Sequence, residues 1–236
     1  MPIPQIPPNR WTALSHRRLQ AHPSPLTSNN TLLAAPLPQW LAQPIIPRFE
    51  QLGVFTGTAH AVPNHVLVNE YRPGEGIMPH EDGGAYSAVV ATVSLGAPIV
   101  LEVVAKRRDG EEDAAASTRN DRHEVNGENA HSAEADDAQE PSAQATPLSK
   151  TRILQEPRSL LVTTGPAYSE LLHGIAPELV DEDLRPATIA NWALLGDAGQ
   201  FAASGRCERG VRVSLTYRDV LKVSKVGMKV LGLGRK

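Results

Sequence analysis

The 236-residue chain has one cysteine, Cys207, and few aromatic residues: 3 Trp, 4 Tyr and 3 Phe. A single thiol cannot form a disulfide within the chain, which excludes a cysteine-rich zinc site and a disulfide-stabilised secreted scaffold. No apolar run approaches the roughly 20 residues that cross a bilayer, and the proline-rich start lacks the apolar region of a signal peptide. We therefore expect a protein of the nucleus and cytoplasm that does not contact a membrane, and we separately expect it to be a monomer.

The net charge of −3 conceals an uneven distribution. Residues 106–150 hold 11 acidic and 6 basic side chains, and residues 205–236 hold 9 basic and 2 acidic ones. The basic C-terminal region could bind a polyanionic partner, although a basic segment of this kind is more often simply a solvated tail.

Residues 106–150 also have almost no large apolar side chain and are rich in Asp, Glu, Ala, Ser, Asn and Gln. Such a segment cannot bury enough surface to offset the entropy lost when it is ordered. We interpret it as a disordered acidic insertion in a single domain that spans residues 1–236. His123 and His131 lie inside it and are poor candidates for a preorganised site.

Runs of β-branched residues bounded by glycine or proline predict five strands, at 65–71, 85–96, 98–104, 158–164 and 210–220. Helical signals are weaker: they comprise residues 36–53, which prolines interrupt, a turn around 167–175, and a loop or short helix in 181–200. Many short strands with few helices indicate a mainly β protein with supporting helices, a sandwich or a barrel.

Polar side chains follow the two-residue period of two predicted strands. Side chains two apart on a strand share a face, which pairs Asn69 with Tyr71. In the last strand the same rule separates an apolar face from a polar one made of Arg212, Ser214, Thr216 and Arg218. If the apolar face packs on its neighbours, the polar face must meet solvent or a wet cavity.

Arg212 and Arg218 lie roughly 20 Å apart along an extended strand, so they cannot both hold one small acid unless the strand coils or bulges, and we expect their roles to differ. A planar guanidinium binds a carboxylate through two parallel hydrogen bonds. A keto acid with a carboxylate at each end would therefore bind a metal at one end and an arginine at the other.

His80 and Asp82 follow the turn RPGEGIMP and can reach one point together. A His-x-Asp pair alone is a weak signal, because a chain with 8 histidines often contains one by chance. A second imidazole would complete the two-histidine, one-carboxylate facial triad that leaves three positions of Fe(II) open. His173 is the candidate, and the alternative is a core histidine bonded to a carbonyl group.

Several motifs together resemble the AlkB family of Fe(II)/2-oxoglutarate dioxygenases, most closely its AlkB homologue six branch. They are RWTALSHRRLQ, PNHVLVNEYRPGEGIMPHEDG, SLG, EPRSLLV, GPAYSELLHGI and RGVRVSLTYR, and they cover nearly all of the chain outside the acidic insertion. The order and spacing of N-x-Y-x-P-G, H-x-D and R-x-S-x-T-x-R make the resemblance specific. It implies a double-stranded β-helix, a jelly-roll core with the iron and the cosubstrate between its sheets.

The resemblance also implies a role for each matching residue. The catalytic iron ligands are His80, Asp82 and His173. The residues expected at 2-oxoglutarate are Asn69, Tyr71, Arg212, Ser214 and Arg218, with Arg212 on the distal carboxylate and Arg218 at the metal-proximal end. Trp11 occupies a position where some relatives place an aromatic that stacks on the substrate, although a structural tryptophan is an equal alternative. Arg17, Arg18 and the basic C-terminal region could meet phosphates.

The resemblance implies an enzyme that uses Fe(II), O₂ and 2-oxoglutarate to hydroxylate a C–H bond. When the hydroxylated group is an N-methyl group, it is released as formaldehyde. The expected substrate is an alkylated base in RNA or single-stranded DNA. Two alternatives stay open: an oxygenase that acts on a protein side chain, and a nucleic-acid-binding protein with a truncated, weakly active site. The second alternative arises because this chain begins ten residues before Trp11, whereas relatives generally carry several dozen more, so we expect the N-terminal part of the family domain to be absent.

Overall fold

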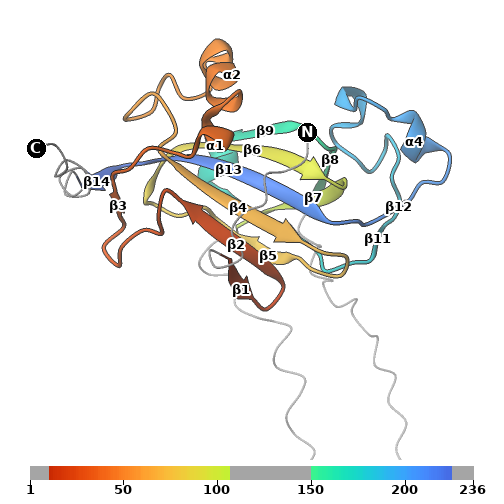
Figure 1. The fold of residues 1–236 in the computed structure, drawn as a ribbon. Coiled ribbons are helices and arrows are strands. Elements are labelled where there is room, and N and C mark those ends of the chain that lie inside the picture. The colour runs from red at the N-terminus through yellow and green to blue at the C-terminus, as the bar shows by residue number, and fades with distance from the viewer. Residues whose placement is uncertain (1–10, 107–149, 225–236) are drawn as a thin grey trace, which may run out of the picture. The chain divides into compact units, whose positions relative to one another are not determined.

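Six strands form the larger of two antiparallel sheets in the computed structural model, which describes residues 11–106 and 150–224 (Figure 1). The strands that the alternating sequence predicted lie at its centre, and β13 pairs with β4 on one side and β6 on the other. In spatial order the sheet consists of β1 (Thr12–Leu14), β2 (Arg17–His22), β4 (His65–Tyr71), β13 (Arg212–Val220), β6 (Tyr86–Gly96) and β9 (Leu160–Thr164).

A four-stranded antiparallel sheet faces the larger one. It consists of β5 (Ile77–His80), β10 (Leu171–Ile175), β7 (Ile99–Ala105) and β8 (Lys150–Gln155). Two short pairs complete the strands: β11 (Val180–Asp181) with β12 (Cys207–Glu208), and β3 (Thr31–Leu33) with β14 (Lys222–Ser224). Two facing antiparallel sheets confirm the predicted mainly β class with a jelly-roll core.

The five predicted strands are present as β4, β6, β7, β9 and β13, with ends within two residues of those expected. The helical signal in 36–53 gives α1 (Gln39–Ala42) and α2 (Ile45–Leu52), which Pro44 separates because it has no N–H to continue a helix. The loop or short helix in 181–200 gives the 3₁₀ turn η2 (Trp192–Leu194) and α4 (Gly199–Ala202).

The turn expected around 167–175 is helical only at its start, in α3 (Pro166–Ser169). The rest of that segment is strand β10, because it pairs with β5 on one side and β7 on the other. The predicted acidic insertion lies almost wholly outside the described residues, as do His123 and His131. No helix in the described part of the chain is long and apolar enough to cross a membrane.

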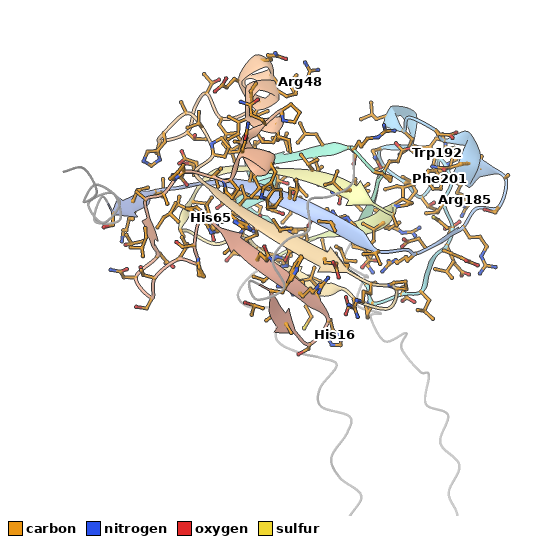
Figure 2. The ribbon with its side chains drawn as sticks, in the orientation of Figure 1. His16, Arg48, His65, Arg185, Trp192 and Phe201 are labelled. Carbon is orange, nitrogen blue, oxygen red and sulfur yellow. The ribbon has the colours of Figure 1, made fainter. Side chains whose placement is uncertain are left out.

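Alternation within the strands sorts the apolar side chains into three layers. Val66, Val68 and Tyr217 on the outer face of the larger sheet pack against Leu41 and Phe49 of α1 and α2, which stand over that sheet in Figure 1. A second cluster covers the outer face of the smaller sheet and includes Leu184 and Phe201, of which Phe201 is labelled in Figure 2. A third, smaller cluster lies between the two sheets, around Tyr71 and Leu101.

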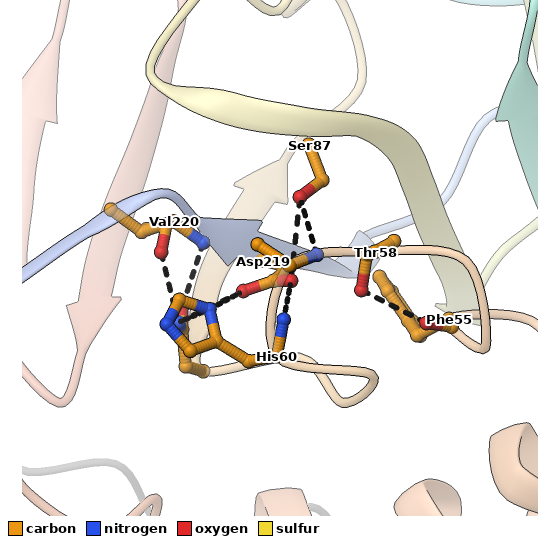
Figure 3. Close-up of polar contacts among 8 residues, drawn as sticks. Phe55, Thr58, His60, Ser87, Asp219 and Val220 are labelled. Carbon is orange, nitrogen blue, oxygen red and sulfur yellow. Dashed lines mark hydrogen bonds and ion pairs between the residues drawn. The ribbon is translucent and has the colours of Figure 1, made fainter.

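A buried carboxylate ties the loop after α2 to the end of β13. Asp219 has no exposed surface, and it accepts hydrogen bonds from the His60 backbone N–H at 2.8 Å and the Asn64 side-chain amide at 3.0 Å. The His60 ring nitrogen Nδ1 lies 2.6 Å from the same carboxylate, and the Ser87 hydroxyl donates to it at 3.3 Å (Figure 3). The residue next to Asp219 in the chain is Arg218, so this anchor fixes the end of the strand that carries a predicted site residue.

We predict that Asp219→Asn lowers the free energy of unfolding by about 2–3 kcal/mol, because hydrogen bonds to a charged group contribute about 1.5–3 kcal/mol each. Urea unfolding of the wild type and the variant measures the difference from the shift of the midpoint. The matched control is Ser87→Ala, which removes two long hydrogen bonds, the one donated to Asp219 and the one accepted from the Ala59 backbone N–H, each at 3.3 Å, and should cost about 1 kcal/mol. Equal midpoints for wild type and Asp219→Asn would contradict the anchoring role.

Candidate active site

The pairing of β13 with β4 places the predicted polar residues side by side on the inner face of the larger sheet. Arg212 lies opposite Tyr71, and Ser214 lies opposite Asn69. All of these side chains line one cavity of about 100 Å³ between the two sheets, as do Thr216 and Arg218. The two-residue alternation in the sequence is therefore confirmed, and the polar face meets a cavity.

Arg212 is a buried cation with no acidic partner among the described residues. It is 2% exposed, and its Nη2 donates to the hydroxyl of Ser94 at 2.9 Å and to Gln155 Oε1 at 2.5 Å. Its Nε has no hydrogen-bond partner in the described part of the chain. Burial lowers the pKa of Arg212 to about 10, so the group stays charged at neutral pH. A buried guanidinium with a spare donor is a receptor for a carboxylate.

Two histidines and one carboxylate meet at the other end of this cavity. His80 at the end of β5 pairs directly with His173 in β10, and their ring centroids are 4.4 Å apart. Asp82 follows His80, and its Oδ2 lies 3.9 Å from His173 Nε2. The other carboxylate oxygen, Oδ1, accepts a hydrogen bond from Arg218. Arg218 and Arg212 thus have different partners, as their separation along the strand predicted.

One ring nitrogen of His80 is occupied by a backbone contact, and burial disfavours the charged form of His173. His80 Nδ1 lies 2.9 Å from the carbonyl oxygen of Met78, and an N–H donated there leaves Nε2 as an acceptor. Burial lowers the pKa of His173, against the raising effect of the Asp82 carboxylate. Neutral imidazoles with one fixed nitrogen are the form that ligates metals.

A glycine allows the two histidine-bearing strands to approach so closely. A Cβ added to Gly174, next to His173, would lie 2.9 Å from the Pro79 nitrogen and 3.0 Å from the Ile77 carbonyl oxygen. Those atoms belong to the backbone of β5, which cannot shift without disturbing its pairing with β10. The close packing of β5 on β10 therefore requires glycine at this position.

The donor set of His80, Asp82 and His173 is the one that suits Fe(II) in oxygenases. Adjacent donors that each lie about 2.1 Å from a common ion are about 3 Å apart, and the 3.9 Å between Asp82 and His173 is about 1 Å longer than that. Within residues 11–106 and 150–224 no three His, Cys, Asp or Glu side chains already converge as metal ligands do. The three residues could hold the ion after a small side-chain adjustment.

Several cavity residues were missed or given another role by the sequence patterns. Gln155 and Ser94 come from β8 and β6 and hold Arg212 in place. Arg17, which the sequence assigned to phosphates, lies in the cavity, and its Nε donates to Asn69 Oδ1 at 3.3 Å. Because that oxygen faces Arg17, the amide N–H₂ of Asn69 is left to donate elsewhere in the cavity.

Trp11 is not brought together with the other predicted residues. It packs against the apolar cluster on the opposite face of the larger sheet, and the guanidinium carbon of Arg18 lies 4.4 Å from its ring centroid. Arg18 also bonds Glu70 at 2.8 Å on that face. The basic residues beyond Ser224 lie outside the described part of the chain.

Comparisons with known proteins agree with this geometry. A match to the 2OG-Fe(II) oxygenase superfamily spans residues 7–218. The chain is similar to the protein named Probable RNA/DNA demethylase ALKBH6 of Danio rerio, with 33% identity over 232 residues that cover 98% of this chain and 82% of that protein.

The chain is also similar to the tRNA (carboxymethyluridine(34)-5-O)-methyltransferase ALKBH8 of Macaca fascicularis, with 26% identity over 215 residues. That match covers 90% of this chain but 26% of the methyltransferase. Among solved structures, that of OsALKBH1 has a TM-score of 0.43 and 13% identity, and the match covers 89% of this chain and 84% of that one.

We predict that Arg212→Ala raises the Kd for 2-oxoglutarate about 100-fold, because removal of one partner from a buried charge pair costs about 2–5 kcal/mol. Calorimetric titration of 2-oxoglutarate into the Mn(II)-loaded protein measures the change. The affinity for Mn(II) itself should not change, because the hydrogen bonds of Arg212 within the described residues go to Ser94 and Gln155. Arg48→Ala, an exposed arginine on α2 (Figure 2), is the matched control. Equal loss of metal and 2-oxoglutarate from Arg212→Ala would refute this role.

We further predict that Arg17→Ala raises the KM for 2-oxoglutarate by about 3- to 10-fold and leaves kcat unchanged, because one hydrogen bond that orients Asn69 is lost. The neighbouring Arg18→Ala is the matched control, since Arg18 faces the other side of the sheet and should leave the KM unaltered. An Arg17→Lys variant keeps a donor and should recover part of the loss. Equal KM values for Arg17→Ala and Arg18→Ala would contradict the orienting role.

Proposed function

Because the chain belongs to the AlkB-like branch of the 2OG-Fe(II) oxygenase superfamily and is a 2-oxoglutarate-dependent dioxygenase, we propose that it demethylates nucleobases oxidatively. Its substrate would be an N-alkylated base in RNA or single-stranded DNA. The observation that carries the proposal is the cavity in which an unpaired buried arginine lies at one end and a two-histidine, one-carboxylate set lies at the other. The name of the Danio rerio relative supports the choice of a nucleic-acid substrate.

The charges in the cavity support a cosubstrate with two carboxylates. Arg17, Arg212 and Arg218 line it, against the single carboxylate of Asp82. Arg212 would bind the distal carboxylate of 2-oxoglutarate, with Ser214 beside it. Asn69 would donate its amide N–H₂, and Tyr71 its hydroxyl, since burial raises the pKa of that phenol and keeps it protonated.

His80, Asp82 and His173 would hold Fe(II). The bound metal supplies the activation of O₂ through which 2-oxoglutarate becomes succinate and CO₂ while one oxygen atom enters a substrate C–H bond. Arg218 would keep one Asp82 oxygen occupied and leave the other for the metal. An N-hydroxymethyl product then releases formaldehyde and leaves the base with N–H.

The loop that carries Asp82 is fixed from both sides, which supports a preorganised site. Tyr168 in α3 donates its hydroxyl to the carbonyl oxygen of Gly83 at 2.7 Å. Arg218 holds Asp82 itself, and the guanidinium carbon of Arg218 lies 4.7 Å from the ring centroid of Tyr86. Because this loop is fixed, the Asp82 carboxylate needs to move little when the metal and the cosubstrate bind.

One observation favours a second candidate, oxygenation of a protein side chain. Strand β1 ends the larger sheet in its described part, and all three of its residues are exposed. An exposed sheet edge can pair with an extended peptide. The uncharged cavity beside the active site, described below, favours a base instead.

We predict that methylated RNA oligonucleotides stimulate succinate release by the purified protein in the presence of Fe(II), ascorbate and 2-oxoglutarate. His80→Ala, Asp82→Ala and His173→Ala should each abolish turnover, whereas Arg48→Ala should retain it. The assay quantifies succinate and formaldehyde together, with unmethylated oligonucleotides as the control. Turnover that methylated peptides stimulate and RNA does not would replace the base with a protein side chain as the substrate.

A further inference from the structure

A second cavity, of about 600 Å³, lies beside the active-site cavity on the same face of the larger sheet. Apolar side chains of β2 and of residues 23–26 form much of its wall, together with Leu67 and Tyr86. Its residues with polar side-chain atoms are Thr12, Ser24, His65 and Tyr86. No acidic, lysine or arginine side chain of the described residues lines it.

His65 is the unexplained residue of this cavity. It lies at the start of β4 (Figure 2) and is 1% exposed, and neither of its ring nitrogens has a hydrogen-bond partner within 3.5 Å among the described residues. The buried hydroxyl of Ser24 likewise has no partner there. A buried polar atom without a hydrogen bond lowers the stability of the folded protein by about 1–3 kcal/mol. Such atoms in native proteins therefore call for an explanation, such as a bound ligand. The two side chains line the same cavity, so one ligand could satisfy both.

The imidazole of His65 is uncharged at neutral pH. Burial lowers its pKa to about 4, and the positive charge of Arg218 contributes, against an opposing effect of the Ser24 backbone. A neutral imidazole offers one N–H donor and one nitrogen acceptor. Together with the hydroxyl of Ser24, it can meet a ligand that has both donors and acceptors on one edge.

The second cavity adjoins the active-site cavity, and a series of side-chain contacts links it to the predicted metal site. Leu67 lines both cavities. The Tyr86 ring stacks on the His65 ring with centroids 6.3 Å apart, and the guanidinium of Arg218 lies over Tyr86. Since Arg218 also holds Asp82, a ligand in the second cavity lies two side chains away from a predicted metal ligand.

We propose that the second cavity binds an uncharged nucleobase of the substrate strand and that His65 and Ser24 select it through the hydrogen bonds of its edge. The inference rests on the proposed function, which it deepens by naming residues that determine specificity. The volume falls in the range of small-ligand pockets, which are mostly apolar with a few placed polar groups. A phosphate or carboxylate does not fit, because no cation lines the walls. Bases separated from their neighbours are read in proteins by hydrogen bonds to their edges.

The first test observes binding without turnover. Adenosine, cytidine, uridine and guanosine are titrated separately against the wild-type protein labelled with ¹⁵N-histidine, and the imidazole signals of His65 are followed by NMR. We expect at least one nucleoside to shift the His65 signals while those of the exposed His16, which lies outside this cavity, stay in place. If no nucleoside shifts the His65 signals, the inference is overturned.

The second test separates this inference from the proposed function. Succinate release stimulated by methylated RNA is compared among wild type, His65→Phe, Ser24→Ala and the control His16→Phe. We expect His65→Phe to raise the KM for RNA about 10-fold or more and to alter the preference among flanking bases, because an unpaired edge is then buried. The KM for 2-oxoglutarate should not change in any of them.

The outcomes of the second test are distinct. Equal RNA kinetics in wild type, His65→Phe and Ser24→Ala would overturn the inference while the proposed demethylation stands. Absence of RNA-stimulated turnover in every protein, the wild type included, would overturn the proposed demethylation, and the nucleoside titration would then decide the inference alone. If His65→Phe fails to fold, which its melting curve shows, Ser24→Ala and the titration carry the decision.

Discussion

The fold and the site both depend on β13, a strand whose nine residues are all buried. Its outer face is apolar and packs against α1 and α2, whereas its inner face carries two arginines, a serine and a threonine. A buried strand with a charged face is stable only if each charge has a partner, since burial of an unpaired charge is costly. Arg218 meets this requirement with Asp82, and Arg212 meets it with neutral groups only. The difference between the two arginines sets what the cavity can bind.

An excess of positive charge therefore surrounds the cavity. Ser94 and Gln155 orient the guanidinium of Arg212 but leave its charge uncompensated, and burial has already lowered its pKa. A dicarboxylate would compensate this charge and at its other end could reach the histidine pair. The guanidinium of Arg212 is already buried and oriented before such an acid binds. Binding would therefore require little rearrangement of the protein, which favours affinity.

The sequence predicted the parts of the site that lie on strands with strict alternation. Asn69 and Tyr71, and the polar set of β13, were correctly placed on one face, and the five most apolar strands were found. Strand β10 was partly obscured by a helical pattern around Tyr168 and Glu170, because two flanking strands, which no local pattern reveals, decide its structure. Trp11 and Arg17 show the same limit. Which face each side chain occupies depends on the pairing of β1 with β2 and on the register of β2 with β4. The hydrogen bond between the side chains of Arg17 and Asn69 joins residues 52 positions apart in the sequence.

His65 could not have been singled out from sequence, since it is one of 8 histidines and its strand is uniformly apolar around it. Alternation does place it on the same face as Asn69 and Tyr71, and its register partner is Arg218. Burial keeps the imidazole of His65 neutral, and the positive charge of Arg218 adds to that effect. One strand pair thus produces a charged cavity at its centre and an uncharged one at its end. The first suits an acid and a metal, and the second suits a neutral ring, so the chemistry of the two cavities follows from the distribution of a few charges along β13.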